Sequence, residues 1–338
     1  MIVLGIESSC DETACGIVDG DGRVLANELY SQIPEHAPFG GVVPEVAARA
    51  HLEKVGPIVR AALDKAGIAL PDVDVVAYTR GPGLMGPVLV GASFARGLAA
   101  ALGKPAAGIN HLEGHIAAAR LSHPDLEPPF LALTVSGGHT QIDRALPGFR
   151  FETLGQTRDD AAGEAFDKCG KLLGLGYPAG PYVSREAKNG DRSAFRFPRA
   201  LRGVDTLDFS FSGLKSAVLR LVESRPAEEL LARRADVCAG LEEAIVDMLT
   251  ERALQAGQAT GIKTLAVCGG VSANPRLREK LPAELEKRGM KALFPDLRYC
   301  TDNGAMIAGA ALFRLKSQCL VFEHLPVSPG LELGEFLQ

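Results

Sequence analysis

A strand-rich opening that occurs twice is the feature that most constrains how this chain can fold. The first copy reads IVLGIES, ACGIVD and RVLANEL, and the second reads FLALTVSGG, HTQIDRAL and FRFETLG. Each copy is a series of short apolar runs separated by turn residues, which predicts a meander of β-strands. The copies share the order of their elements but not their residues. We therefore interpret the chain as a topological duplication.

After each meander the pattern alternates between helices and strands. The first half predicts a helix around residues 46–66, a strand VDVVAYT, a glycine-rich helix at 83–102 and a strand AAGIN. The second half predicts helices at 160–173 and 235–258, a strand KTLAVCGG, a helix at 276–288, a strand KALFP and a helix that starts at Asp302. The expected α/β packing is two lobes with an interlobe cleft, as in the duplicated actin, sugar-kinase and Hsp70 fold.

A Rossmann fold is disfavoured, because no GxGxxG motif opens a helix after the first strand and no Walker A motif occurs. The chain has 338 residues, enough for two domains. We predict an N-terminal lobe of residues 1–110 plus about 303–325, a C-terminal lobe of residues 111–302, and a tail of residues 326–338.

Cysteine usage and the apolar segments indicate a cytoplasmic protein with no membrane contact. Seven cysteines without a CxxC pair argue against a disulfide framework and a cysteine-rich zinc site. The N-terminus lacks the basic region of a secretory signal. The apolar stretch at 83–102 contains Arg96 and ends in a Gly-Lys-Pro turn, which favours a buried helix.

The overall charge does not predict nucleic-acid binding, since 36 basic residues face 41 acidic ones. One segment differs: residues 185–202 contain six basic residues against two acidic ones. This basic segment is either a solvated face or a nucleic-acid contact surface.

Two histidines, His111 and His115, stand four positions apart in NHLEGH. On a helix this spacing places both imidazoles on one face, within reach of a single metal ion. An incidental surface pair has the same spacing. The zincin pattern HExxH requires a glutamate where Leu112 stands, and Glu113 points to a different face. Asp302 is a candidate third ligand, although an N-cap or first-turn acid is the simpler role for it.

Two glycine-rich turns, which we expect in matching halves of the duplicated fold, each follow a strand and could bring backbone N–H groups to a phosphate in a shared nucleotide cleft. They read SGGHT from Ser136 and GGVSAN from Gly269. The hairpin tip in GIESSCDET carries Ser8, Ser9, Asp11 and Glu12, which suit either a metal–phosphate site or a solvated turn.

Three further stretches have simple structural interpretations. Asp167 lies on a predicted helix as a solvated carboxylate, and Gly180 lies in a turn, YPAGP. Ser210 or Ser212 is expected to cap a helix that begins in FSFSGLK.

Ten motifs together resemble one family. They are GIESSCDET, GGVVPE, TRGPGL, HLEGH, VSGGHTQ, DDAAGEAFDK, YPAGP, DFSFSGLK, GGVSAN and TDNGAMIA. In this order they are similar to bacterial tRNA N6-adenosine threonylcarbamoyltransferases over about residues 2–315. The resemblance implies an actin-like fold and transfer of threonylcarbamoyl from threonylcarbamoyl-AMP to N6 of adenosine 37 in ANN-decoding tRNAs, with release of AMP.

The resemblance also implies site residues and partners. It implies a metal, Fe²⁺ or Zn²⁺, held by His111, His115 and Asp302, and an adenine nucleotide bound as threonylcarbamoyl-AMP or ATP. The implied substrate-binding residues are Thr134, Val135, Ser136, Gly137, Gly138, Asp167, Gly180 and Asn274. No catalytic residue is assigned, and Asp11 or Glu12 is the candidate acceptor for the proton of the adenine amine. The implied partners are tRNA, an inactive actin-like paralogue and a small P-loop ATPase.

Three other functions explain the same residues less well. An actin-like ATPase or sugar kinase has no need of HLEGH, and a metallo-endopeptidase lacks its glutamate. A non-catalytic scaffold has no need to keep both HLEGH and TDNGA intact.

Overall fold

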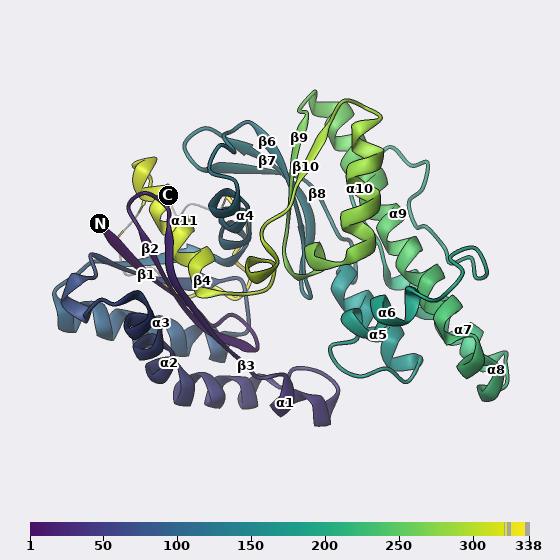
Figure 1. Ribbon diagram of the computed structural model, residues 1–338, viewed down its shortest axis with the longest axis horizontal. Helices are drawn as coiled ribbons and strands as arrows, with labels where there is room; N and C mark the ends of the chain where they lie inside the picture. The colour runs from purple at the N-terminus through teal and green to yellow at the C-terminus, as the bar shows by residue number, and fades with distance from the viewer. Residues whose placement is uncertain (321, 323–325, 335–338) are drawn as a thin grey trace. The chain divides into compact units, whose positions relative to one another are not determined.

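A computed structural model describes residues 1–320, 322 and 326–334, and divides the chain into two compact units (Figure 1). The first unit comprises Met1–Pro128, Ala145–Glu152 and Pro295–Gln338. The second unit comprises Pro129–Arg144 and Thr153–Phe294. Residues 335–338 of the predicted tail lie outside the described residues.

The first unit is built on a five-stranded sheet in the order β3-β2-β1-β4-β5. The first three strands form the predicted antiparallel meander, and β4 and β5 add to β1 in parallel. The strands are β1 Ile2–Glu7, β2 Glu12–Asp19, β3 Val24–Ser31, β4 Val75–Gly81 and β5 Ala106–Asn110.

Helices cover both faces of this sheet, because residues of the buried strands alternate between two cores. Val3 packs with α4 and α11, whereas Leu4 and Ile6 pack with α2 and α3. The helices are α1 Ile33–His36, α2 Pro44–Ala66, α3 Met85–Leu102, α4 His111–Ser122 and α11 Gly304–Lys316. Short 3-10 turns are η1 Ala37–Phe39, η2 Leu70–Asp72 and η4 Leu297–Tyr299.

The second unit repeats this topology, with the sheet order β10-β9-β6-β7-β8. Strand β9 pairs with β6, and β10 pairs with β9, both in parallel. Its strands are β6 Phe130–Val135, β7 Thr140–Leu146, β8 Arg150–Gln156, β9 Thr264–Cys268 and β10 Lys291–Leu293. Its helices are α5 Ala162–Leu172, α6 Ala179–Ala187, α7 Ser212–Glu223, α8 Ala227–Ala232, α9 Arg234–Thr260, η3 Gly270–Ala273 and α10 Pro275–Glu286. The predicted duplication is confirmed by these two matching sheets.

The unit boundaries differ from those predicted from the sequence. Helix α4 groups with the first unit rather than opening the second, because it packs along α11 and their side chains share one core. The described part of the tail also belongs to the first unit: the Ser328 N–H donates to the Arg80 carbonyl, and the Asn110 amide donates to the Glu332 carbonyl.

We predicted that the helix at 83–102 is buried, but helix α3 is buried on one side only. Among the described helices, α3 alone is long and apolar enough to cross a membrane. Core helices of soluble proteins can have the same length and composition, and a third of α3 is buried. Its buried side contains Val88, Ala92 and Ala95, while Met85 and Leu89 are exposed on the other side.

Candidate metal and substrate site

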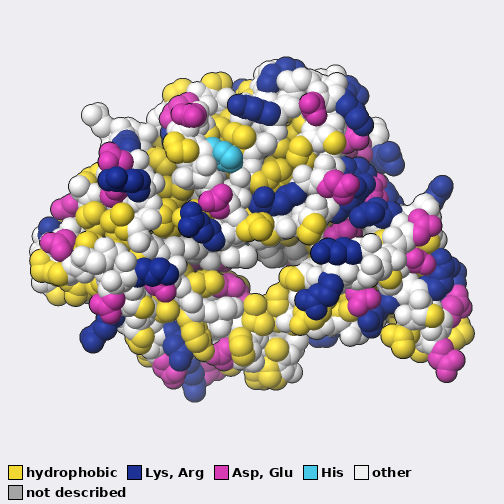
Figure 2. Space-filling view, viewed as in Figure 1, with side chains coloured by type: hydrophobic (Ala, Val, Ile, Leu, Met, Phe, Trp, Pro, Cys, Tyr) yellow, Lys and Arg dark blue, Asp and Glu magenta, His cyan; other side chains and the backbone are white. Residues whose placement is uncertain are grey.

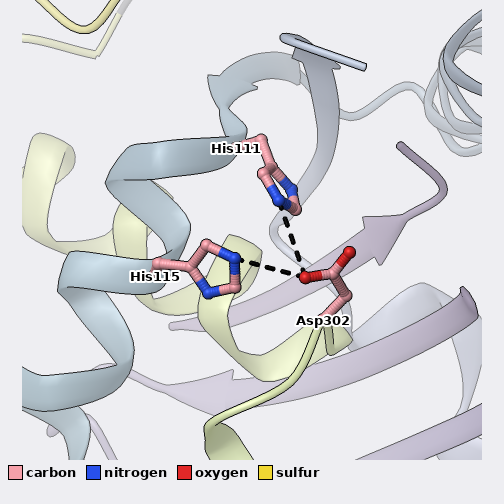
Figure 3. Close-up of side chains that lie close together, drawn as sticks. All are labelled: His111, His115 and Asp302. Carbon is pink, nitrogen blue, oxygen red and sulfur yellow. Dashed lines mark ion pairs between the residues drawn. The ribbon is translucent and has the colours of Figure 1, made fainter. Parts of the chain in front are cut away.

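His111, His115 and Asp302 come together in the first unit. Helix α4 begins at His111, directly after β5, and the Asn110 side chain caps it by accepting from the Leu112 N–H at 2.9 Å. Asp302 Oδ1 lies 3.6 Å from His111 Nε2 and 3.2 Å from His115 Nε2 (Figure 3). The simpler N-cap role for Asp302 is wrong, because Asn303 caps α11 through the Met306 N–H.

Close backbone packing brings α11 to this position. A Cβ on Gly304 would lie 2.0 Å from the Gly16 nitrogen, so only glycine lets the start of α11 rest directly on β2. On α4, a Cβ on Gly114 would lie 2.9 Å from Ile307 Cδ1. Gly304 therefore allows α11 to approach β2, and Gly114 allows α4 to approach α11, which brings the histidines near Asp302.

Glu7, which we did not single out from the sequence, orients His111. Its Oε2 lies 3.0 Å from His111 Nδ1 and accepts from the Thr79 hydroxyl at 2.6 Å. Its Oε1 accepts from the Ser9 N–H at 2.5 Å. A hydrogen on Nδ1 directed at Glu7 places the lone pair of His111 on Nε2, the arrangement in which a carboxylate supports a histidine metal ligand. The only signal in the sequence is an acid at the end of an apolar strand.

The charges of this cluster depend on one another. Burial lowers the pKa of His111, but Glu7 and Asp302 outweigh it and raise that pKa to about 9. Burial raises the pKa of Glu7, yet the imidazole of His111 brings it below its ordinary value. Burial, Asp11 and Asp302 raise the pKa of Glu12 well above its usual range. A positive charge at this place, whether imidazolium or metal ion, is thus stabilised by the surrounding carboxylates.

The three residues fit a metal ion. Their ligand atoms all lie within 4.8 Å of one another. Both nitrogens of His115 are buried and make no hydrogen bond among the described residues. A buried polar atom without a partner costs free energy, and a metal bound at Nε2 supplies a partner for that nitrogen. Two imidazoles and a carboxylate suit zinc or ferrous iron and leave coordination positions open.

Glu113 takes no part in this cluster, as the sequence predicted. It forms a buried ion pair with Arg314 of α11, with Oε2 2.7 Å from Nε and Oε1 2.5 Å from Nη2. A general base needs a carboxylate that can reach a reacting group, so the structure gives no support to a metallo-endopeptidase.

Both glycine-rich turns lie in the second unit, side by side, so the expectation of one turn in each half is wrong. Thr134 of β6 pairs with Cys268 of the parallel strand β9, so the segments that follow both strands start at one edge of the sheet. The Ser136 hydroxyl accepts from the His139 N–H at 3.1 Å and shapes the first turn. Gly137 and Gly138 are exposed there, and no atom of the described chain lies within 4 Å of where their Cβ atoms would be. Their backbone is open to a ligand.

Three other predicted residues of this unit lie at helix starts, and two of them, Asp167 and Asn274, bind helix N–H groups. Asp167 accepts from the Ala179 N–H at 2.6 Å at the start of α6, so its expected solvated role is wrong. Gly180 lies inside α6 rather than in a turn, because the chain becomes helical directly after Pro178. Asn274 caps α10, and its amide donates to Ser184 and Glu242 at 2.8 and 2.9 Å.

The expected capping by Ser210 or Ser212 is also wrong. Phe211 is the N-cap residue of α7, and Asp159 accepts from the Phe211 N–H at 2.7 Å and from the Ser212 N–H at 3.1 Å. Both serine hydroxyls donate to the same carboxylate, which supplies the capping charge in their place.

Three of the six basic residues of the segment 185–202 lie near acidic residues of α9. Arg199 lies 2.8 Å from Asp247, Arg192 lies 3.7 Å from Glu243, and Arg202 lies 3.9 Å from Glu251. On the visible face of the second unit, basic and acidic side chains are interspersed (Figure 2). These ion pairs support a solvated face for the part of the segment that contains Arg192, Arg199 and Arg202.

Fold and site together define a class: an actin-like α/β protein with a buried cluster able to bind one metal ion. Solved structures with this fold include HypF of T. kodakarensis, with a TM-score of 0.63 and 14% identity over 93% of this chain and 48% of that one. They also include component A of (R)-2-hydroxyglutaryl-CoA dehydratase from Acidaminococcus fermentans, with a TM-score of 0.57 and 16% identity over 94% and 99%.

Sequence relatives identify the family. The profile of tRNA N6-adenosine threonylcarbamoyltransferases matches residues 23–309. Curated enzymes of that name are 49% identical in Clostridium perfringens and 50% identical in Clostridium beijerinckii, each over 99% of this chain and 98% of the relative. The chain belongs to this family and is a transferase that modifies tRNA.

Proposed function

We propose that the chain transfers the threonylcarbamoyl group of threonylcarbamoyl-AMP to N6 of adenosine 37, just 3′ of the anticodon, in ANN-decoding tRNAs. The convergence of His111, His115 and Asp302 in a member of this family is the observation that carries the proposal. In the reaction a C–N bond forms between N6 and the carbamoyl carbon, the bond to the phosphate oxygen breaks, and AMP leaves.

The substrate is a mixed anhydride and therefore already activated. The protein has to orient it, exclude water and stabilise the charge that develops on the leaving phosphate. These requirements fit a site without a covalent nucleophile.

The three clustered residues would hold one Fe²⁺ or Zn²⁺ ion. Such an ion, when bound, supplies a Lewis acid that polarises a carbonyl and orients the threonylcarbamoyl end. Within this arrangement Glu7 would keep the Nδ1 proton of His111 in place, and Asp302 lies within 3.6 Å of Nε2 of both imidazoles.

The adenylate would bind to the second unit. The exposed backbone of Gly137 and Gly138, together with the segment that follows β9, offers N–H groups for the phosphate. Thr134 and Val135 end the strand that carries this turn, and Ser136 begins the turn. Asp167, Gly180 and Asn274 would shape the same pocket through the starts of α6 and α10.

A proton must leave the adenine amine during transfer. We assign its acceptor to Asp11 or Glu12 on the hairpin loop, because this loop directly follows Glu7 and Glu12 interacts electrostatically with Asp302. Separate Asp11→Asn and Glu12→Gln variants distinguish the two, since only the acceptor's variant loses turnover while it retains metal and substrate.

The proposed setting is the cytoplasm, with tRNA, an inactive actin-like paralogue and a small P-loop ATPase as partners. The first unit has exposed apolar side chains to which a protein partner could bind: Phe39, Leu52, Met85 and Leu89 on η1, α2 and α3. Isolated exposed apolar residues are common, but α2 and α3 pack together and present several on adjoining helices.

A replacement experiment tests the proposed function. In a bacterium depleted of its own enzyme, the chain should restore threonylcarbamoyladenosine in total tRNA, measured by mass spectrometry of nucleosides. Asp302→Ala should not restore it, whereas Asp296→Ala, an exposed aspartate six positions earlier, should. Restoration by Asp302→Ala would remove that residue from the proposal, and failure of the unmodified chain with its partners present would refute the proposed function.

A further inference from the structure

A chain of buried hydrogen bonds in the first unit leads to the loop that carries Asp11 and Glu12. We propose that its four side chains, those of Thr13, Gln32, His36 and His51, are positioning residues that hold residues 8–12 beside Asp302 for the transfer reaction. All four are buried, and none belongs to the metal cluster. The expected effect on kcat rests on the proposed function, whereas the support of the loop by the network does not.

The outer half of the network joins α1 to the strand β2. The Val43 N–H lies 3.3 Å from His36 Nδ1, and His36 Nε2 lies 3.2 Å from Oε1 of the Gln32 side chain. The Gln32 amide nitrogen lies 3.4 Å from the Thr13 hydroxyl. A backbone N–H can only donate, so Nδ1 of His36 accepts and its Nε2 donates.

The inner half joins β2 and α2 to the loop. The Thr13 hydroxyl lies 2.8 Å from His51 Nδ1, and His51 Nε2 lies 3.0 Å from the Cys10 carbonyl. A carbonyl can only accept, so Nε2 of His51 carries the hydrogen and its Nδ1 accepts from Thr13. Burial lowers the pKa of His51, which agrees with a neutral ring.

The directions deduced from the two ends agree where they meet at Thr13. Gln32 donates to the Thr13 oxygen, and Thr13 donates its one hydrogen to His51. Five consecutive bonds thus run in a single direction from Val43 to Cys10. Such a network has one satisfied arrangement, and breaking it at any point leaves buried polar groups without partners.

Other hydrogen bonds also hold the loop, so the network is one of several contacts that fix its position. The Gln32 N–H donates to the Asp11 carbonyl at 2.9 Å, and the Leu84 N–H donates to the Ser9 carbonyl at 2.8 Å. Glu7, at one end of the loop, contacts His111. Cys10 and Glu12 both interact electrostatically with Asp302. A shift of the Cys10 carbonyl would therefore move the loop carboxylates relative to the metal cluster.

The test compares Thr13→Val, which removes the hydroxyl at nearly constant volume, with Thr13→Ser, which keeps it. Thr250→Val on α9 is the matched control, since Thr250 is buried and its hydroxyl has no hydrogen-bond partner among the described residues. Gln32→Met breaks the network one bond further out, in case Thr13→Val does not fold. The measurements are amide hydrogen exchange of residues 8–12, kcat and KM for transfer, and binding of Co²⁺ followed by its absorption spectrum.

For Thr13→Val we expect faster exchange of the loop amides and a kcat at least about tenfold lower, because a small misplacement of reacting groups is costly. KM and Co²⁺ affinity should stay within about threefold, because neither the ligands nor the second unit is altered. Thr13→Ser should restore kcat and loop protection, and Thr250→Val should leave both unchanged.

Three results would overturn the proposal. They are an unchanged kcat in Thr13→Val, a Thr13→Ser variant as impaired as Thr13→Val, and loop amides that exchange as fast in Thr250→Val as in Thr13→Val. The first would show that the network only stabilises the fold. If the unmodified chain transfers nothing, the proposed function has failed, and loop exchange in the three variants then decides whether the network holds the loop.

Discussion

Glu113 and Arg314 form a two-point ion pair buried between α4 and α11, with distances of 2.7 and 2.5 Å. Helix α4 carries both histidines, and α11 begins two residues after Asp302. The ion pair therefore joins the two segments that carry the proposed metal ligands.

Removing one charge of this pair should be strongly destabilising. Glu113→Gln leaves the Arg314 guanidinium buried without its counter-ion, and we expect a loss of about 3–5 kcal/mol in the free energy of unfolding. Urea denaturation measures this loss. Glu45→Gln breaks an exposed ion pair with Arg49 and should cost less than about 0.5 kcal/mol. Equal effects of the two variants would contradict a stabilising role for the buried pair.

The carboxylate of Glu7 should control metal affinity without being a ligand. Glu7→Gln keeps the size of the side chain but removes the charge that fixes the Nδ1 proton of His111. We expect the Kd for Zn²⁺ to rise about 10- to 100-fold, as is typical when the partner of a histidine ligand is lost. Competition with a chromophoric chelator measures the Kd, and an unchanged value would show that Glu7 does not orient His111 for a metal.

Glycine at position 304 should be required by the close contact with β2. In Gly304→Ala the new Cβ would lie 2.0 Å from the Gly16 nitrogen, and backbone cannot move aside as a side chain can. We expect a loss of at least about 2 kcal/mol in thermal or urea unfolding. Gly97→Ala is the control: it lies within α3 with open space around it and should gain up to about 1 kcal/mol. A neutral Gly304→Ala would disprove the close contact.

Asp143 should make stability depend on pH. Burial raises its pKa to about 7, although Gln141 and Thr153 donate hydrogen bonds to it and lower that pKa in part. Between about pH 4 and 7 the folded chain then holds a proton that the unfolded chain has lost, so this group's contribution to stability falls as pH rises.

The Asp143→Asn variant isolates this contribution. The difference in unfolding free energy between the unmodified chain and the variant should change by up to about 1.4 kcal/mol per pH unit in that range and level off above pH 7. A difference that is independent of pH would show that Asp143 is ionised in the folded chain.

The sequence predicts what depends on local pattern. The strands, the long helices and the duplicated topology follow from apolar periodicity and turn residues, and the one-face placement of His111 and His115 follows from their spacing. The Glu7–His111 contact joins residues 104 positions apart, and no local pattern encodes it. Two helix caps were also predicted wrongly, because several neighbouring polar residues can cap the same helix. Asn303 rather than Asp302 caps α11, and Asp159 rather than a serine caps α7.

Transfer by the purified chain tests the central claim most directly. Threonylcarbamoyl-AMP labelled in the threonine, an ANN-decoding tRNA transcript and the proposed partners are combined, and AMP and modified nucleoside are counted in the same sample. We predict one AMP for each threonylcarbamoyladenosine, located at position 37, and loss of both with His111→Ala, which should also lose its bound metal ion. Release of AMP without label in the tRNA, or full transfer by the metal-free His111→Ala variant, would contradict the account.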